Sequence, residues 1–176
     1  MMRTGVAAAL AVTSLLCSVG SVCAVELPTR KPGLWEIKIK LTGGVMPTAK
    51  MFHCTDEKTD REMSTMFNPM RPVACEKRDV EKATSGYTID SICRFEGKYI
   101  TMHSDVTGDF TSKYTVVTET KTSDDESSPP SITNLTLEAS YLGACKPDQK
   151  PGDVTMAGGM TVNIKDLEKF ERLLRR

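Results

Sequence analysis

Apolar and charged residues alternate over residues 35–41, just after the turn signal Pro32-Gly33. Successive side chains of a β-strand point to opposite faces, so this spacing predicts a strand with one buried face and one exposed face. The apolar positions are Trp35, Ile37, Ile39 and Leu41. Trp35 is the one tryptophan of the chain, at the buried end of this strand. We therefore expect Trp35 to be a structural anchor of the core and not a platform for a ligand.

Further segments rich in β-branched and aromatic residues follow at regular intervals. Several are separated by turn signals such as Thr84-Ser85-Gly86, Glu96-Gly97 and Thr107-Gly108-Asp109. The predicted strands cover residues 35–41, 48–54, 74–83, 87–95, 99–106, 111–121 and 131–142. Short antiparallel strands at this spacing predict a mainly β fold. We expect a curved antiparallel sheet of about seven strands, a meander that resembles a half-barrel or a barrel.

Two segments have helical character instead. Residues 55–67 begin with a cap residue followed by acids and are stopped by Pro69 and Pro72, which predicts a short helix inserted between two strands. After Cys145 the chain is rich in proline and glycine, as expected for a flexible linker. Asn163 then caps a predicted C-terminal helix whose apolar face is formed by Ile164, Leu167, Phe170 and Leu174.

The first 24 residues have the composition of a secretory signal peptide. They combine Arg3, an apolar run over residues 6–16, and small or apolar residues before a cleavage point after Ala24. The run is shorter than the ~20 apolar residues of a membrane-spanning helix. We therefore predict an exported protein that does not span the membrane. Its parts are a signal peptide (1–24), an antiparallel β domain (25–146), and a flexible linker with a C-terminal helix (147–176).

The charges of the chain are balanced. The sequence has 23 Lys and Arg residues and 23 Asp and Glu residues. A protein without excess positive charge has no broad electrostatic attraction for nucleic acid or for an anionic membrane. We expect no nucleic-acid partner.

Four cysteines follow the predicted signal peptide, at Cys54, Cys75, Cys93 and Cys145. An even number in an oxidising compartment predicts two disulfides. We favour Cys54–Cys75, which would close the helical insert, and this leaves Cys93–Cys145. A simple meander instead puts Cys75 beside Cys93, so Cys75–Cys93 with Cys54–Cys145 is the alternative.

Candidate catalytic residues are few. The chain contains two histidines, His53 and His103, and neither belongs to a recognisable catalytic motif. We therefore predict that the protein is not an enzyme. The alternative is a hydrolase in which His53 or His103 meets a serine or an acid in a cleft.

Methionine is the one unusual count, with 10 in the chain. Met63 and Met66 have helical spacing, and Met51 and His53 lie upstream. Thioethers with an imidazole suit copper(I), so a copper-handling protein is an alternative. Methionine more often fills irregular gaps in a core. We favour that interpretation and predict no metal and no cofactor.

Several short motifs occur together in a particular order. They are Lys31-Pro32-Gly33-Leu34-Trp35-Glu36, Cys54-Thr55-Asp56-Glu57, the spaced Cys75 and Cys93, and Tyr141-Leu142-Gly143-Ala144-Cys145-Lys146. This pattern resembles the bacterial exported family called domain of unknown function 3617. The resemblance implies a periplasmic location in a Gram-negative bacterium, and it brings no established activity.

The function that we expect is a non-catalytic binding module. A curved sheet without catalytic motifs favours a small apolar ligand, or a protein partner in the cell envelope, held on the concave face.

Overall fold

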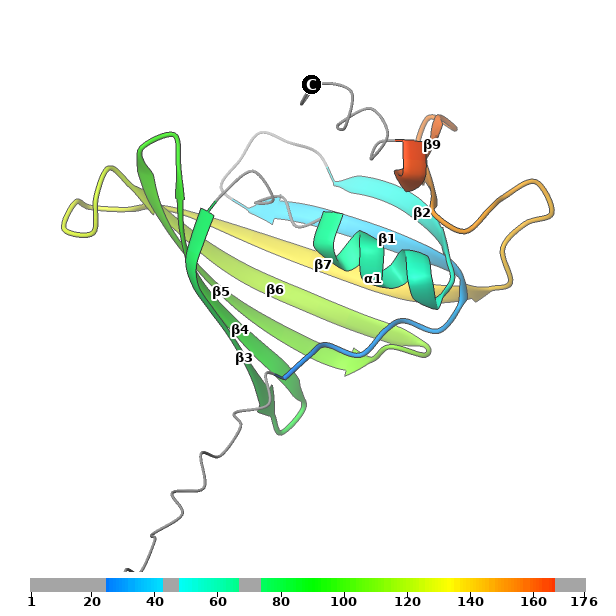
Figure 1. Ribbon diagram of the computed structural model, residues 1–176, viewed down its shortest axis with the longest axis horizontal. Coiled ribbons are helices and arrows are strands. Elements are labelled where there is room, and N and C mark those ends of the chain that lie inside the picture. Colours follow the sequence, from blue (N-terminus) through cyan, green and yellow to red (C-terminus); the bar gives the residue numbers. More distant parts are fainter. Residues whose placement is uncertain (1–24, 43–47, 67–73, 167–176) are drawn as a thin grey trace, which may run out of the picture.

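The computed structural model describes residues 25–42, 48–66 and 74–166. This part of the chain forms one antiparallel sheet and one α-helix (Figure 1). The elements are β1 (Gly33–Thr42), β2 (Ala49–Thr55), α1 (Glu57–Met66), β3 (Ala74–Ala83), β4 (Gly86–Phe95), β5 (Lys98–Asp109), β6 (Lys113–Ser123), β7 (Ser131–Gly143), β8 (Asp153–Met156) and β9 (Thr161–Asn163).

The strand order across the sheet is β3-β4-β5-β6-β7-β1-β2-β8-β9. Strands β3 to β7 form a meander, and β7 then pairs with β1, which brings the start of the chain into the middle of the sheet. The predicted mainly β, antiparallel fold and its inserted helix are confirmed. The sheet is open, because β3 and β9 lie at opposite edges and do not pair with each other.

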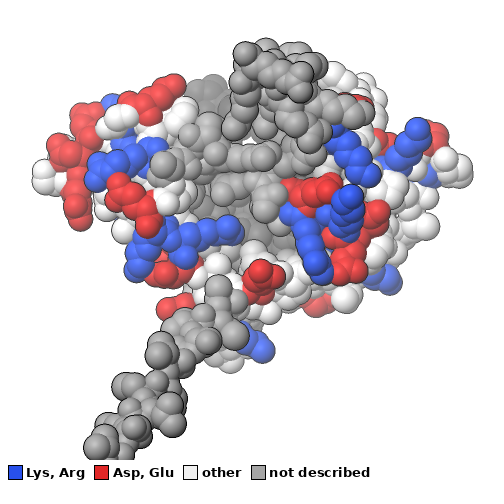
Figure 2. Space-filling model, in the orientation of Figure 1, with Lys and Arg blue, Asp and Glu red and all other residues white. Residues whose placement is uncertain are grey.

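The sheet has two chemically different faces. We call the face that carries Trp35 the inner face, and Figure 1 shows α1 lying across it in front of β1 and β7. The core of this face is the cluster of Trp35, Ile37 and Ala139, against which Tyr114 and Tyr141 pack. The opposite, outer face carries the charged residues of the alternating strands. Figure 2 shows the molecule from the side on which α1 lies, and acidic and basic side chains are interspersed there too, as the balanced charge of the sequence implies.

Trp35 is fully buried at the centre of this core. Its ring lies 5.5 Å from that of Tyr141 and 5.8 Å from that of Tyr114, both measured between ring centroids. Its indole N–H donates to the carbonyl oxygen of Lys31 at 2.8 Å. A buried tryptophan needs such an acceptor, so the backbone just before β1 is held against the sheet.

The disulfides are Cys54–Cys145 and Cys75–Cys93. The favoured pairing of Cys54 with Cys75 is wrong, and the alternative pairing is the one found. The reason is strand order: β4, β5, β6, β7 and β1 all lie between β3 and β2, so Cys75 cannot reach Cys54. Cys75 and Cys93 are instead directly opposite each other on adjacent strands.

The segment after Cys145, expected to be a flexible linker, contains two strands that prediction missed. Strand β8 pairs with β2 on the side away from β1, and β9 pairs with β8. Val154 and Ile164 are buried there, with Met51 packed against them. The strands are only four and three residues long, so the surrounding prolines and glycines dominated the sequence pattern.

The predicted ends of the chain lie mostly outside the described residues. A helical turn does begin at Ile164, and the Asn163 side-chain oxygen caps it by accepting the backbone N–H of Lys165 at 3.0 Å. The remainder of the predicted C-terminal helix and the predicted signal peptide both fall outside the described ranges. Within those ranges, no helix has the length and apolar character needed to cross a membrane.

The two disulfides provide a matched test of the topology. Cys54–Cys145 spans 91 residues and Cys75–Cys93 spans 18. The loop-entropy relation gives roughly 4.5 kcal/mol for the first bridge and roughly 3 kcal/mol for the second. We expect the Cys54→Ala/Cys145→Ala variant to lose about 1.5 kcal/mol more unfolding free energy than the Cys75→Ala/Cys93→Ala variant in urea titrations. An equal loss, or peptide mapping that links Cys54 to Cys75, would contradict this topology.

Candidate functional site

A buried ion pair joins α1 to the segment before β1 on the inner face. The Arg30 backbone N–H donates to Asp60 Oδ2 at 2.7 Å, and its Nε donates to Oδ1 at 2.5 Å. The exposed fractions of Arg30 and Asp60 are 8% and 5%. The guanidinium carbon also lies 5.8 Å from the centre of the Trp35 ring. The cluster thus combines a charged pair with the central aromatic of the core.

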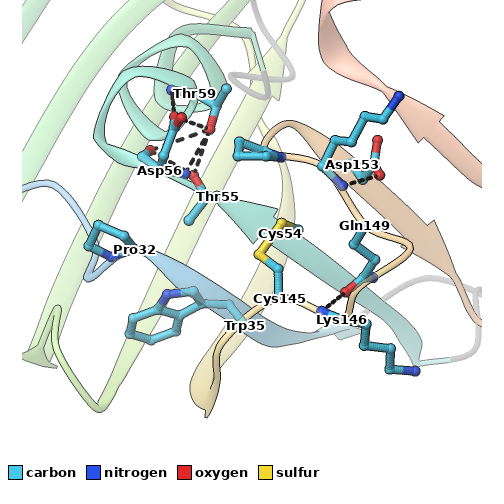
Figure 3. Close-up of a disulfide and its surroundings, with 12 residues drawn as sticks. Pro32, Trp35, Cys54, Thr55, Asp56, Thr59, Cys145, Lys146, Gln149 and Asp153 are labelled. Atoms are coloured by element: carbon cyan, nitrogen blue, oxygen red, sulfur yellow. Dashed lines mark hydrogen bonds between the residues drawn. A yellow bond between two sulfur atoms is a disulfide. The ribbon is translucent and has the colours of Figure 1, made fainter.

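The local sequence at the start of α1 positions Asp60. Asp56 Oδ1 accepts the backbone N–H of Thr59 at 2.8 Å, and Thr59 Oγ1 accepts the backbone N–H of Asp56 at 2.9 Å. This reciprocal cap, drawn in Figure 3, fixes the first turn of the helix. Thr59 Oγ1 also donates to Asp56 Oδ1 at 2.8 Å, and the hydrogen bonds that the carboxylate accepts from the Thr59 N–H and hydroxyl lower the pKa of Asp56. With the first turn fixed, the next residue, Asp60, faces Arg30.

His53 lies beside this ion pair. Its Nδ1 is 3.5 Å from Arg30 Nη1. Burial, together with the positive charge of Arg30, lowers the pKa of His53 to about 3. The imidazole is therefore neutral at ordinary pH, and it is a weak base. A neighbouring guanidinium also disfavours a bound metal cation, so this position offers little support for copper.

His103 lies on the other face of the sheet. Its Nδ1 is 2.8 Å from Asp90 Oδ1, and its Nε2 is 3.7 Å from Asp105 Oδ2. The hydrogen bond with Asp90 raises the pKa of His103. A shallow hollow of about 260 Å³ surrounds it, lined in part by Lys77, Thr101 and Lys121. The two histidines thus lie on opposite faces, and the structure does not bring them together.

The methionines that suggested copper are not brought to a common site by the described contacts. Met51 packs against both hydrophobic clusters, around Trp35 and around Val154, as a gap-filling residue does. The side chains of Met63 and Met66 lie outside the described residues. Within the described ranges, no group of three or more His, Cys, Asp or Glu side chains is arranged to hold a metal ion.

An apolar pocket lies at the junction of β1, β2, the end of β7 and the β8–β9 turn. We call it the outer pocket, and its cavity volume is about 600 Å³. Leu34 and Phe52 point away from the inner-face residues Trp35 and His53 that adjoin them in β1 and β2. The lining consists of Leu34, Lys50, Phe52, Leu142, Lys146, Gln149, Thr155, Met156, Ala157 and Gly159.

A bulge places Leu142 in this lining. In the pairing of β1 with β7, Leu34 is opposite Gly143 while Trp35 is opposite Tyr141, so Leu142 is an extra residue. A bulge of this kind re-aims a side chain. Leu142 is 53% exposed, which is unusual for a leucine at the end of a central strand.

The Cys54–Cys145 disulfide joins two segments that contribute residues to the outer pocket. It ties the end of β2 to the chain just after β7, where Lys146 and Gln149 follow (Figure 3). The Lys146 backbone N–H donates to Gln149 Oε1 at 3.1 Å, and the Gln149 N–H donates to the Lys146 carbonyl at 3.0 Å. The Gly152 N–H donates to the Cys54 carbonyl at 2.8 Å, which anchors the start of β8.

Sequence reasoning missed the outer pocket although a signal was present. Leu34, Phe52 and Leu142 occupy positions that the alternation assigns to the polar face of three neighbouring strands. One such exception carries no information, because single exposed apolar residues are common. Three exceptions become informative only when strand order shows that they are adjacent.

Comparison with known proteins shows the family to which the chain belongs. Residues 30–145 match the family model described as "Protein of unknown function (DUF3617)". The chain belongs to this family. No curated protein and no solved structure matches the chain.

The DUF3617 match covers only part of the lining of the outer pocket. It includes all four disulfide cysteines and strands β1 to β7, and with them Leu34, Lys50, Phe52 and Leu142. The wall formed by Lys146, Gln149 and the β8–β9 turn lies beyond the matched residues. The family description names no activity.

The Arg30–Asp60 pair predicts non-additive substitutions. Removing one partner of a buried pair leaves an uncompensated charge, whereas replacing both with apolar residues is often nearly neutral. We expect Arg30→Met to cost about 3 kcal/mol of unfolding free energy. We expect the Arg30→Met/Asp60→Leu variant to be more stable than Arg30→Met or Asp60→Leu alone. Urea titrations of the four proteins measure this, and simple additivity of the two losses would contradict it.

The low pKa of His53 predicts acid sensitivity. Unfolding raises the pKa of this residue from about 3 to the ordinary histidine value of 6.5, so the unfolded state binds a proton first as the pH falls. Stability from this group is therefore complete above pH 6.5 and is lost progressively below it. Between pH 7 and pH 5 we expect His53→Gln to lose about 2 kcal/mol less than the unsubstituted protein. Identical pH dependence in urea titrations would show that His53 titrates normally.

Proposed function

We propose that the protein is a non-catalytic binding module of the cell envelope that holds a small apolar ligand in the outer pocket. The observation that carries this proposal is the cluster of Leu34, Phe52 and Leu142 around a cavity of about 600 Å³ on a face that is otherwise mostly polar. That volume lies within the roughly 300–1,000 Å³ of sites that hold small molecules. Exposed apolar surface around a cavity marks binding surfaces more often than structural ones.

The position of the ligand differs from the one the sequence suggested. A curved sheet favoured the concave, inner face, but next to α1 that face is occupied by Trp35 and the Arg30–Asp60 pair. The outer pocket lies on the opposite side of the same strands. Two of its apolar side chains are open to solvent, with Leu142 53% and Met156 36% exposed, whereas Leu34 is buried.

The cell envelope is the expected location. The first 24 residues have the pattern of a signal peptide. Two disulfides fit an oxidising compartment, as for an exported protein. We propose the periplasm as that compartment.

A protein partner is the second candidate for the same surface. It is favoured by Met160, which is 63% exposed in the β8–β9 turn beside the pocket. Methionine-bearing apolar surfaces adapt to the shape of a partner. A ligand and a partner differ in that only a ligand needs the cavity itself.

Substitutions of Leu142 and of Ile132, a comparably exposed residue of the same strand, test the ligand proposal. Leu142 and Ile132 both belong to β7 and are 53% and 51% exposed, but only Leu142 lines the pocket. We expect the neutral dye Nile red to bind the protein with increased fluorescence. Leu142→Ser should weaken that binding about five-fold, because half-exposed leucine contributes roughly 1 kcal/mol of apolar contact. Ile132→Ser should leave it unchanged.

Two results of the dye titration would contradict the proposal. One is the absence of saturable dye binding to the unsubstituted protein. The other is an equal loss in Leu142→Ser and Ile132→Ser, which would indicate non-specific adsorption to exposed apolar residues. Circular dichroism of both variants checks that the fold is retained.

A further inference from the structure

The charged residues of the outer pocket are all of one sign. Among the described residues, Lys50 and Lys146 are the charged side chains of the lining, and no carboxylate lines it. The one acidic residue of β1 and β2 is Glu36, which is opposite Phe52 in the strand register. Positive charge is therefore concentrated at the rim of an apolar cavity.

Glu36 does not neutralise this charge. Its carboxylate is shared by two lysines, with Lys38 Nζ at 2.9 Å and Lys50 Nζ also in contact. The hydrogen bonds from Lys50 and Lys38 lower the pKa of Glu36, so it stays ionised. Lys38 also lies opposite Glu138 of β7, whose charge acts on it, so Glu36 offsets at most the charge of Lys50, and Lys146 adds an ammonium group elsewhere in the lining.

Cationic and apolar groups lie directly against each other at this rim. Lys50 Nζ is 5.1 Å from the centre of the Phe52 ring, so an ammonium group lies over the aromatic floor. The opposite wall, the turn from Met156 to Gly159, is uncharged. A ligand that satisfies both parts has an apolar body on Phe52 and Leu142 and a negative group within reach of a lysine of the lining.

From this arrangement we infer that the ligand is a single-chain amphiphile with an anionic head group, a carboxylate or a phosphate. This inference rests on the proposed binding function and specifies its ligand class. The cavity of about 600 Å³ suits one acyl chain, whereas a two-chain lipid is larger than the molecules that such sites enclose. Charge complementarity supplies selectivity, and the apolar floor supplies most of the affinity.

Four probes that share a dodecyl chain test the inference. They are dodecanoate, dodecyl phosphate, dodecyl maltoside and dodecyltrimethylammonium, titrated below their micelle concentrations by calorimetry at low salt. We expect both anionic probes to bind at least ten-fold more tightly than the neutral probe. The cationic probe should bind most weakly.

Lysine variants assign the charge effect to the pocket. We expect Lys50→Gln and Lys146→Gln each to weaken dodecanoate binding about three-fold, the size of one exposed ion pair. Dodecyl maltoside binding should change less than two-fold. Lys113→Gln is the matched control, because Lys113 is an exposed lysine of β6 that does not line the pocket.

The outcomes separate the inference from the function on which it rests. Equal affinity for all four probes, still weakened by Leu142→Ser, would overturn the anionic ligand and keep the binding module. Failure of every probe and of Nile red would overturn both. Binding to phosphatidylglycerol vesicles without binding of free probes would overturn the inference in favour of docking on a membrane surface.

Discussion

The position of β1 between β7 and β2 is the constraint on which the rest of the molecule depends. In the described sheet, the meander from β3 to β7 is joined to the group formed by β2, β8 and β9 through β1. Strand β1 pairs with both, and its alternating side chains serve two purposes at once. Trp35 and Ile37 complete the core on the inner face, and Leu34 contributes to the outer pocket. A one-residue slip in β1 would exchange these two faces.

A buried ion pair on the inner face holds α1 in place and also affects the protonation of a neighbouring histidine. The Arg30–Asp60 pair links α1 to the chain before β1, and its geometry depends on the cap that Asp56 and Thr59 form. Burial, together with the charge of the same guanidinium, lowers the pKa of the neighbouring His53 and keeps it neutral. A buried ion pair contributes more to a defined arrangement than to net stability. The buried polar cluster of Arg30, Asp60 and His53 is therefore explained by structure, and we propose recognition on the opposite face.

Local pattern predicted most of the elements, and strand order was what it could not predict. The period-two alternation located β1, and the turn residues located the hairpins of the meander, because both signals are contained in a few neighbouring residues. The disulfide pairing depends on which strands are adjacent, and the sequence alone did not show that β1 separates β7 from β2. Strands β8 and β9 form because β2 offers a pairing edge, which is a tertiary effect. The outer pocket was missed for the same reason, since its apolar residues come from separate strands and from the bulge at Leu142.

The open sheet leaves two edges, and each is a potential template for an additional strand from another molecule. The β3 edge carries Lys77, Asp79 and Glu81 on alternate positions, and charged residues of this kind discourage strand addition. The β9 edge is only three residues long, too short for extended pairing. Both ends of the sheet are thus protected against edge-to-edge aggregation by different means. The protein can therefore keep an unclosed sheet without the ring of hydrogen bonds that a barrel would provide.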